Sequence, residues 1–513
     1  MKLKNILFKG FAFGAVLLTT SCGSDYLDAE PSEFLSGDGI DKTTEEDNSR
    51  IQAYLTGAYY NIYCGGNFQT SHDDFGMPAI RLATDLMCDD VAYPRDANWF
   101  CYDYQMDNRS SNYRRVGSTW NQLYNVIENV NTAIAKLKTP DGSAPEDDNN
   151  RVMLGEAYSL RAYAYFWLIN LFQQPLSEGA DQLGVPLKTE TTYRPERVPV
   201  GEIYKQIQSD IDKGYKLLEG YGLSMKTAIS EYSAAGIYAE VLMFTGDYRN
   251  AAKYAEIASE GAALASKSEL LGGFNSLSMP ETLWGYDVNN ETTMFYASFF
   301  SHMGSYQVGY GGTSGYRKMI SSQLYDQIAD DDVRKGWFGL NNDYASVCNA
   351  KFSYETSNGY DNFVENKFLD VYITSKGIEG MLTSDIIYMR SGTMCFVAAE
   401  AYYLANQPND AKRMLEKVMA TRIDGYTCDK SGQALYDEIC LQKRIDTWGE
   451  GCRYLDAKRR NETIDRTLSV NHAADLAVME ALTYSARDYR MIYQIPLKEL
   501  QNNDAIPSSQ QNP

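Results

Sequence analysis

The sequence feature that most restricts the fold is a helical pattern that occurs twice, in register, far apart in the chain. The matching positions are Ala239, Glu240, Ala251 and Glu256 in the first copy, and Ala399, Glu400, Ala411 and Glu416 in the second. In the first copy, helical spacing runs over 233–245 and 248–264, with Gly246-Asp247 at the turn. Small residues recur where two helices approach closely, as in tetratricopeptide repeats. The pattern predicts helical hairpins stacked side by side, a scaffold that presents a surface.

Further segments also have the apolar spacing of helices. They are Asn48–Tyr63, Trp120–Leu137, Asn149–Phe172 and Glu202–Leu218. The third of them is apolar almost all round, so we expect it to be central. Arg161 lies in that segment and is expected to pair with a carboxylate.

Two long segments lack any such period: from about Cys64 to Val116, and from about Ala265 to Ser384. Both are rich in Gly, Asn, Asp and aromatic residues, and so long an irregular segment is unusual inside a helical protein. Insertions on repeat scaffolds often form one face, which is often the binding face. We therefore expect a mostly α protein, with tetratricopeptide-like helical hairpins supporting a large irregular, loop-rich ligand-binding region.

The first residues have the pattern of an export signal. Lys2, Lys4 and Lys9 give a basic start, an apolar stretch follows to Leu18, and small polar residues lead to Cys22. The apolar stretch is too short for a spanning helix, which needs about 20 residues. A cysteine directly after small residues suggests a lipobox with Cys22 as the lipidated residue. An ordinary signal peptide with a chance cysteine is the alternative.

These patterns divide the chain into five expected parts. They are a lipoprotein signal peptide at 1–21, a lipid-anchored tether at 22–46, an N-terminal helical region at 47–264, an irregular aromatic insertion with the expected binding face at 265–384, and a C-terminal helical region at 385–513 that completes the scaffold. No later stretch is apolar over about 18 residues, so membrane contact is expected through the lipid only.

Composition argues against several classes of function. The net charge of −21 repels phosphates, so nucleic acid is not an expected partner. The three histidines, His72, His302 and His472, lie far apart, which weighs against zinc sites and Ser-His-Asp catalysis. No complete calcium loop occurs, and we expect no metal and no cofactor. The cysteines are too many to assign a bridge, but Cys395 lies in an apolar run and is expected to be a reduced core residue.

Several segments, in the appropriate order, resemble the motifs of one family. They are Cys22–Pro31, Trp120–Asn131, Gly155–Trp167, Glu450–Asp456 with Arg459, and Ile495-Pro496 with Glu499 and Asn502. By these motifs the chain resembles the SusD/RagB family of nutrient-capturing surface lipoproteins. It departs from the family at the framework positions Gln442, Asp446 and Gly449. Arg453, Asp456 and Glu450 fall three apart and are expected to form a network along one helix.

The resemblance implies a place and a function. Proteins of this family are lipid-anchored at the outer membrane, where they cover a SusC-like TonB-dependent barrel. They bind oligosaccharides or, in the RagB branch, peptides, without catalysis. The acidic residues Asp25, Asp28 and Glu30 resemble the export tags of lipoproteins that face the cell exterior. We therefore expect a surface lipoprotein, not an enzyme, that captures an oligosaccharide and delivers it to such a barrel, with peptide capture as the alternative.

Aromatic residues of the irregular segments are the expected ligand contacts, because sugar rings stack on aromatic faces and amides bond to sugar hydroxyls. The first group is Asn98, Trp99 and Tyr102, and the second is Trp284, Tyr286, Tyr306 and Tyr310. Internal packing is the alternative for each aromatic residue.

A glycoside hydrolase is the distant alternative, since it needs two closely spaced carboxylates. The candidates are Asp73-Asp74, Asp89-Asp90 and Asp330-Asp331-Asp332. In so acidic a chain such pairs arise by chance, and we expect them to lie on solvated faces of loops.

Overall fold

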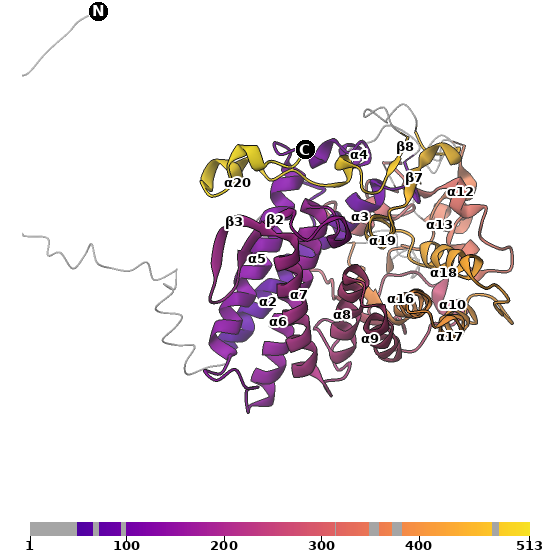
Figure 1. Ribbon diagram of the computed structural model, residues 1–513. Coiled ribbons are helices and arrows are strands. Elements are labelled where there is room, and N and C mark those ends of the chain that lie inside the picture. Colours follow the sequence, from indigo (N-terminus) through magenta and orange to yellow (C-terminus); the bar gives the residue numbers. More distant parts are fainter. Residues whose placement is uncertain are drawn as a thin grey trace, which may run out of the picture. The chain divides into compact units, whose positions relative to one another are not determined.

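Helices make up most of the described chain, and the predicted mostly α fold class is confirmed (Figure 1). The computed structural model describes residues 49–64, 71–93, 99–312, 314–347, 359–371, 382–473 and 482–513. Strands in these ranges form only two-stranded antiparallel sheets. The predicted signal peptide and the whole predicted tether, including Cys22, lie outside the described residues.

Three long helices lie side by side in the first half of the chain. α5 (Arg114–Leu137) packs against α6 (Asp148–Phe172), and α6 packs against α7 (Val200–Leu218). α6 is buried over nearly its whole length, which confirms its predicted central position. As predicted, Arg161 of α6 pairs with a carboxylate, since its Nη2 lies 2.7 Å from Oδ1 of Asp210.

The two predicted hairpins are neighbours. The first is α8 (Glu231–Thr245) with α9 (Tyr248–Glu260), the second is α16 (Ser391–Leu404) with α17 (Pro408–Met419), and α9 packs directly against α16. Gly246 ends α8 with φ of 81°, a left-handed conformation that glycine adopts readily.

Residues of the repeated pattern lie where these helices meet. Ala251 and Ala411 are fully buried. Glu256 of the first hairpin pairs with Arg413 of the second at 2.8 Å and accepts a hydrogen bond from the hydroxyl of Tyr402. Among the acidic positions of the pattern, Glu256 therefore connects the first hairpin to the second.

Short elements make up the irregular insertion. They are α10 (Lys267–Leu270), β4 (Thr282–Tyr286), α11 (Phe299–Met303), β5 (Met319–Ile320), α12 (Ser322–Tyr325), η5 (Val333–Trp337), α13 (Asn342–Val347) and η6 (Asp361–Phe363). β4 pairs with β6 (Ile386–Arg390), which leads directly into α16.

The earlier irregular segment is joined to this insertion through a sheet. After α2 (Ser49–Cys64) it contains α3 (Met77–Leu86), β1 (Val91–Ala92), α4 (Cys101–Tyr104) and η3 (Asp107–Arg109). β1 pairs with β5, with Val91 opposite Ile320. Backbone hydrogen bonds thus place together two segments that lie far apart in the sequence.

The remaining elements flank α7 or end the chain. They are η4 (Leu176–Glu178), β2 (Leu183–Lys188), β3 (Tyr193–Pro199), α18 (Gln433–Asp446), α19 (Arg453–Arg460), β7 (Thr463–Asp465), η7 (Arg466–Leu468), β8 (Thr483–Ser485), η9 (Tyr489–Met491), α20 (Leu497–Asn502) and η10 (Ser508–Gln510). β2 pairs with β3, and β7 pairs with β8.

Buried ion pairs connect α18 to the insertion. The carboxylate of Asp446 lies 2.9 Å from the guanidinium groups of both Arg390 and Arg422, and both arginines also pair with Glu281. Burial alone would raise the pKa of Asp446, but these cations hold it well below its usual value.

The expected network of Arg453, Asp456 and Glu450 along one helix is wrong. α19 begins at Arg453, so Glu450 precedes the helix. Arg453 pairs with Asp89 at 2.8 Å, and Asp456 pairs with Lys443 at 2.7 Å. These charges connect separate segments because burial makes a partner from another element necessary.

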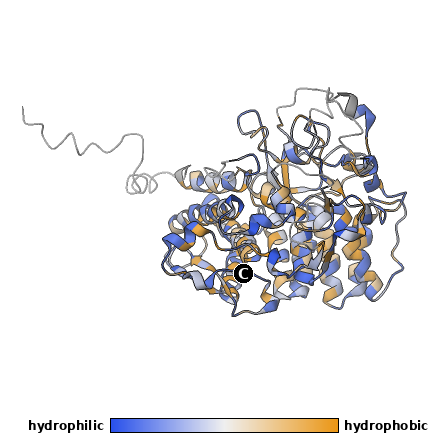
Figure 2. Ribbon diagram, turned by 90° about the horizontal axis from the view of Figure 1, so that it is seen from above, coloured by the Kyte–Doolittle hydropathy of each residue, from blue (hydrophilic) through white to orange (hydrophobic). Residues whose placement is uncertain are grey.

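The described residues from 51 to 513 form one compact unit with a large hydrophobic core and a small second cluster around Tyr306 and Met319, and Figure 2 shows helices with hydrophobic and hydrophilic sides. Cys395 is a buried thiol of this core, as predicted, and burial raises its pKa to about 11. Within the described ranges, no helix combines the length and the hydrophobicity needed to cross a membrane.

Candidate functional site

Four rings from the two irregular segments meet at the surface, in what we call the aromatic cluster: His72, Trp99, Tyr296 and Tyr310. The His72 ring stacks against Trp99 at 5.3 Å and against Tyr296 at 6.4 Å between ring centres. Tyr310 meets Trp99 edge to face at 5.9 Å and Tyr296 at 6.0 Å. Tyr296 is 46% exposed, His72 is exposed, and the other two are half-buried. The cluster therefore offers aromatic surface to solvent.

A buried layer supports the cluster from beneath. The His302 ring stacks on Tyr310 with centres 4.7 Å apart and also contacts Phe75 and Phe100. Its Nε2 donates to the carbonyl oxygen of His72 at 2.8 Å, since a carbonyl only accepts. Burial holds the pKa of His302 well below its ordinary value, so the ring is neutral at neutral pH.

The cluster contains one internal hydrogen bond and one buried ring nitrogen without a described partner. The Tyr310 hydroxyl lies 2.6 Å from Nδ1 of His72, which fixes the two rings relative to each other. The Nε1 of Trp99 is buried and has no hydrogen-bond partner among the described residues.

The backbone is strained where two of the rings are held. Trp99 has φ of 63°, and Phe295, directly before Tyr296, has φ of 49°. Residues other than glycine seldom adopt this left-handed region, at a cost of about 1–3 kcal/mol each. Such strain persists only where surrounding contacts enforce it, and it often occurs at functional sites.

Glycines bring the Tyr310 loop close to the rest of the protein. A Cβ on Gly309 would lie 2.7 Å from Cα of Ser301, and one on Gly312 would lie 1.9 Å from the carbonyl oxygen of Gln307. Both distances are shorter than real contacts allow. These glycines therefore permit the backbone to approach other backbone, which fixes Tyr310 above His302.

Ion pairs hold the loop that carries His72. Arg115 is 2% exposed as a side chain and pairs with Asp73 and Asp103, each at 3.0 Å. Arg114 pairs with both Asp73 and Asp74. Burial raises the pKa of Asp103 even beside Arg115. The residue following His72 is thereby fixed to the start of α5.

The other predicted ligand contacts lie in different surroundings. Tyr102 is 51% exposed, and its ring centre is 6.0 Å from that of Tyr113. Tyr286 is half-buried and stacks face to face on Tyr63 at 4.0 Å. Asn98 lies outside the described residues.

Two predicted contacts are corrected by their burial. Trp284 is 1% exposed, because β4 directs it into the core against Tyr163 and Tyr388. Tyr306 is fully buried, and its hydroxyl accepts a hydrogen bond from the backbone N–H of Asn341 at 2.9 Å. Neither presents a ring face to a ligand, so both are packing residues.

The sequence prediction missed His72 and Tyr296 as site residues. Tyr296 lies in the aromatic-rich stretch of the insertion, so its signal was present but no stronger than that of its neighbours. His72 had no signal, because a lone histidine acquires a role only through its partners in space.

The acidic pairs considered for hydrolysis are engaged in ion pairs. Asp73 pairs with Arg115 as described above. Asp89 and Asp90 pair with Arg453 and Arg444. Asp332 lies 2.6 Å from Arg334. These carboxylates are therefore partners of arginine side chains within the described residues.

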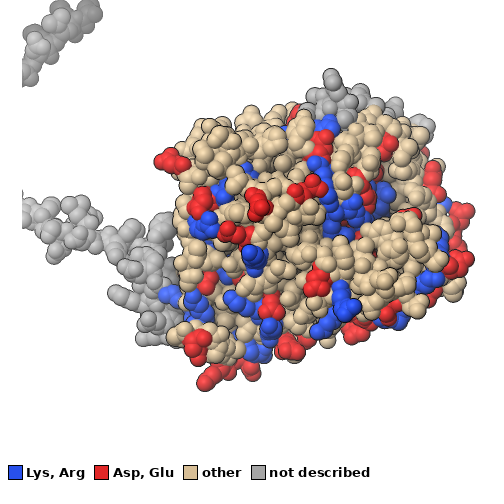
Figure 3. Space-filling view, viewed as in Figure 1, with Lys and Arg blue, Asp and Glu red and all other residues tan. Residues whose placement is uncertain are grey.

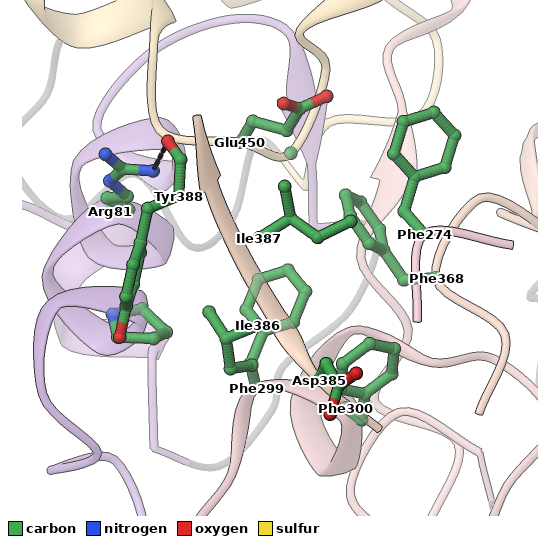
Figure 4. Close-up of a pocket in the computed structure, with 12 residues that line it drawn as sticks. Arg81, Phe274, Phe299, Phe300, Phe368, Asp385, Ile386, Ile387, Tyr388 and Glu450 are labelled. Carbon is green, nitrogen blue, oxygen red and sulfur yellow. Dashed lines mark hydrogen bonds between the residues drawn. The ribbon is translucent and has the colours of Figure 1, made fainter. Parts of the chain in front are cut away.

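An interior cavity beside β6 is too small for a sugar. Figure 4 shows Arg81, which donates to the carbonyl oxygen of Tyr388 at 2.9 Å, and Glu450 among apolar side chains. The cavity measures about 30 Å³, and a second one around Lys443 measures about 50 Å³. Small-molecule sites usually measure about 300–1,000 Å³.

Charged side chains of both signs are interspersed over the face viewed in Figure 3, with a concentration of Lys and Arg beside α19. Arg459 and Arg460 of this helix pair with Glu400 at 2.6 and 2.7 Å. Their side chains are only 9% and 5% exposed, so these two arginines are engaged in ion pairs within the protein.

Comparison with known proteins identifies the class. A SusD-like carbohydrate-binding protein from Bacteroides vulgatus has a TM-score of 0.73 at 20% identity, covering 91% of this chain and 98% of that structure. A surface glycan-binding protein A from Bacteroides uniformis has a TM-score of 0.64 at 17% identity, covering 91% and 99%. The fold is thus that of the SusD superfamily.

Sequence comparisons give the family itself. Residues 25–242 match a family model described as starch-binding and associating with the outer membrane, and residues 278–513 match the model of the SusD family. A SusD-like protein of Formosa agariphila is 24% identical over 383 residues, which cover 67% of this chain and 72% of the relative. The chain belongs to the SusD family.

Proposed function

We propose that the aromatic cluster binds an oligosaccharide at the cell surface. The observation that carries this proposal is the convergence of Trp99, Tyr296 and Tyr310 with His72 at one solvent-facing place. Flat rings at the surface suit the apolar faces of sugars. Strained backbone at Trp99 and before Tyr296 indicates that the surrounding structure enforces this arrangement.

Polar groups beside the rings suit sugar hydroxyls. The Tyr310 hydroxyl and the His72 ring can both donate and accept hydrogen bonds. Burial keeps the pKa of His302 well below its ordinary value, so this ring itself adds no charge beneath the cluster.

Family membership supports the wider role. Two of the structures with this fold are a carbohydrate-binding protein and a surface glycan-binding protein. For this chain we infer a lipoprotein anchored through Cys22 at the outer membrane, facing outward, that captures a glycan without catalysis. Delivery to a SusC-like TonB-dependent barrel completes the proposed function.

The test is the binding of Trp99→Ala to glycans, measured by affinity electrophoresis and calorimetry against the wild type. Removing a well-used aromatic anchor costs about 2 kcal/mol or more, roughly a thirtyfold loss of affinity. Tyr193→Ala is the matched control, because Tyr193 is 62% exposed on β3 and outside the cluster.

Normal glycan binding by Trp99→Ala, with unchanged circular dichroism, would place the site elsewhere. If the wild type instead binds mixed peptides and no glycan, the RagB-like alternative is correct. The rings would then be apolar subsites for peptide side chains.

A further inference from the structure

A second concave surface lies between the start of α5 and α20, which we call the α5–α20 groove. Its volume is about 680 Å³, within the range of ligand sites and far above that of the interior cavities. Tyr113, Gly117 and Asn121 line one side, and Glu499, Gln501 and Asn502 line the other.

The lining suits sugar hydroxyls. Asn121, Gln501 and Asn502 are exposed, and their side-chain amides make no hydrogen bond to another described residue. Each amide both donates and accepts, and the Glu499 carboxylate is an additional acceptor. Tyr113, which is 36% exposed, supplies an aromatic surface at the edge.

Two contacts link the groove to residues beside the aromatic cluster. Arg114, at the groove, pairs with Asp73, the residue directly after His72. Tyr113 contacts Tyr102 on α4, the short helix that follows Trp99. Figure 1 shows α4 and α20 at the same end of the molecule.

Gly117 keeps the groove open. It lies within α5, where glycine is less favourable than alanine by about 0.5–1 kcal/mol. A Cβ at this position would meet no atom of the described residues within 4 Å. A larger side chain there therefore projects into free space and fills the groove without displacing the protein.

We propose that the α5–α20 groove is a second subsite, which takes the continuation of the oligosaccharide held at the aromatic cluster. This inference rests on the proposed function. A chain long enough to reach both places gains contacts that a short one lacks, so affinity rises with glycan length. The occupant is a carbohydrate because unengaged amides, one carboxylate and a tyrosine form its lining.

The experiment uses Gly117→Phe to fill the groove and Gly117→Ala as the matched control. The probe is a size series, from disaccharide to octasaccharide, cut from whichever of starch, xylan, arabinan, mannan or pectin the wild type binds in affinity electrophoresis. In the wild type and Gly117→Ala, long chains should bind on the order of tenfold more tightly than short ones. Gly117→Phe should lose this difference while its affinity for short chains is unchanged.

Different failures have different meanings. If Gly117→Phe and Gly117→Ala bind glycans of every length with equal affinity, the groove is not a glycan subsite. The proposed function of the aromatic cluster is then unaffected. If Gly117→Phe binds glycans of every length normally but loses a co-purifying protein, the groove is a protein contact, and the proposed subsite is also overturned. If the wild type binds none of these polysaccharides, the proposed subsite and the proposed function are both overturned. If Gly117→Phe fails to fold, Asn121→Ala combined with Gln501→Ala decides the same question, with a selective loss for long chains expected.

Discussion

Tyr310 is the residue at which ring contacts and hydrogen bonding in the cluster coincide. Tyr310→Phe keeps the ring on His302 but removes the hydroxyl that bonds to His72. Since a hydrogen bond of this kind contributes about 0.5–1.5 kcal/mol, we expect glycan affinity to fall less than about tenfold. Tyr310→Ala should lose more, because the ring goes as well. Calorimetry distinguishes the two, and equal losses would contradict a role for the ring.

His302 gives a pH dependence whose sign can be stated. Its pKa is lowered by burial in the folded protein but is about 6.5 when unfolded, so below that pH only the unfolded state gains the proton. Acidification therefore favours unfolding, by up to about 1.4 kcal/mol per pH unit. His302→Gln cannot titrate. The difference in unfolding free energy between wild type and variant, from denaturant titrations between about pH 7.5 and pH 5, should shrink as the pH falls. A difference independent of pH would be inconsistent with this account.

Residue identity alone could not separate ligand contacts from core. Trp284, Tyr306 and Tyr310 all lie among glycines in one insertion, yet only Tyr310 reaches the surface. The separation follows from strand pairing and backbone path, as with β4, which directs Trp284 inward. Such contacts are non-local and leave no local signature.

Among the secondary-structure elements, the sequence could predict those whose apolar residues recur with helical spacing. The helical spacing of apolar residues predicted α6 and the two hairpins. Glu256, one position of the repeated pattern, joins the two hairpins through its ion pair with Arg413. The two-residue strands β1 and β5 have no periodicity, so their pairing could not be predicted. That pairing joins the two irregular segments that form the aromatic cluster.

Substitution of Ala255 tests how tightly the hairpins pack. It is fully buried on α9, which packs against both α8 and α16. Ala255→Leu should destabilise the protein by about 1–3 kcal/mol, because added methylenes overpack a filled interface. Lys253→Leu adds the same side chain at an exposed position of α9 and should change stability by less than about 0.5 kcal/mol. Similar values for both, from thermal or denaturant unfolding, would show that this interface is loosely packed.

For the whole molecule, the lipid is the proposed connection to the membrane. We expect Cys22→Ala to abolish lipid labelling and to move the protein from the membrane fraction to the soluble fraction. In the described ranges no helix is long and apolar enough to cross a membrane. Labelling with a fatty-acid analogue followed by fractionation measures both effects. Full membrane retention of the unlabelled variant would show that another segment, or a partner, holds the protein there.

Capture and uptake require that the binding protein and its transporter act together, so the last prediction concerns the complex. The SusD family models match most of the chain. This favours docking on a TonB-dependent barrel in the way expected for the family. We expect a TonB-dependent barrel among the proteins that co-purify after gentle detergent extraction, identified by mass spectrometry. Trp99→Ala should retain the barrel while losing the glycan, since the two contacts are proposed to be separate. Repeated recovery of the chain alone, from membranes in which a barrel of this class is present, would contradict the assembly and leave a glycan-binding lipoprotein without a transporter partner.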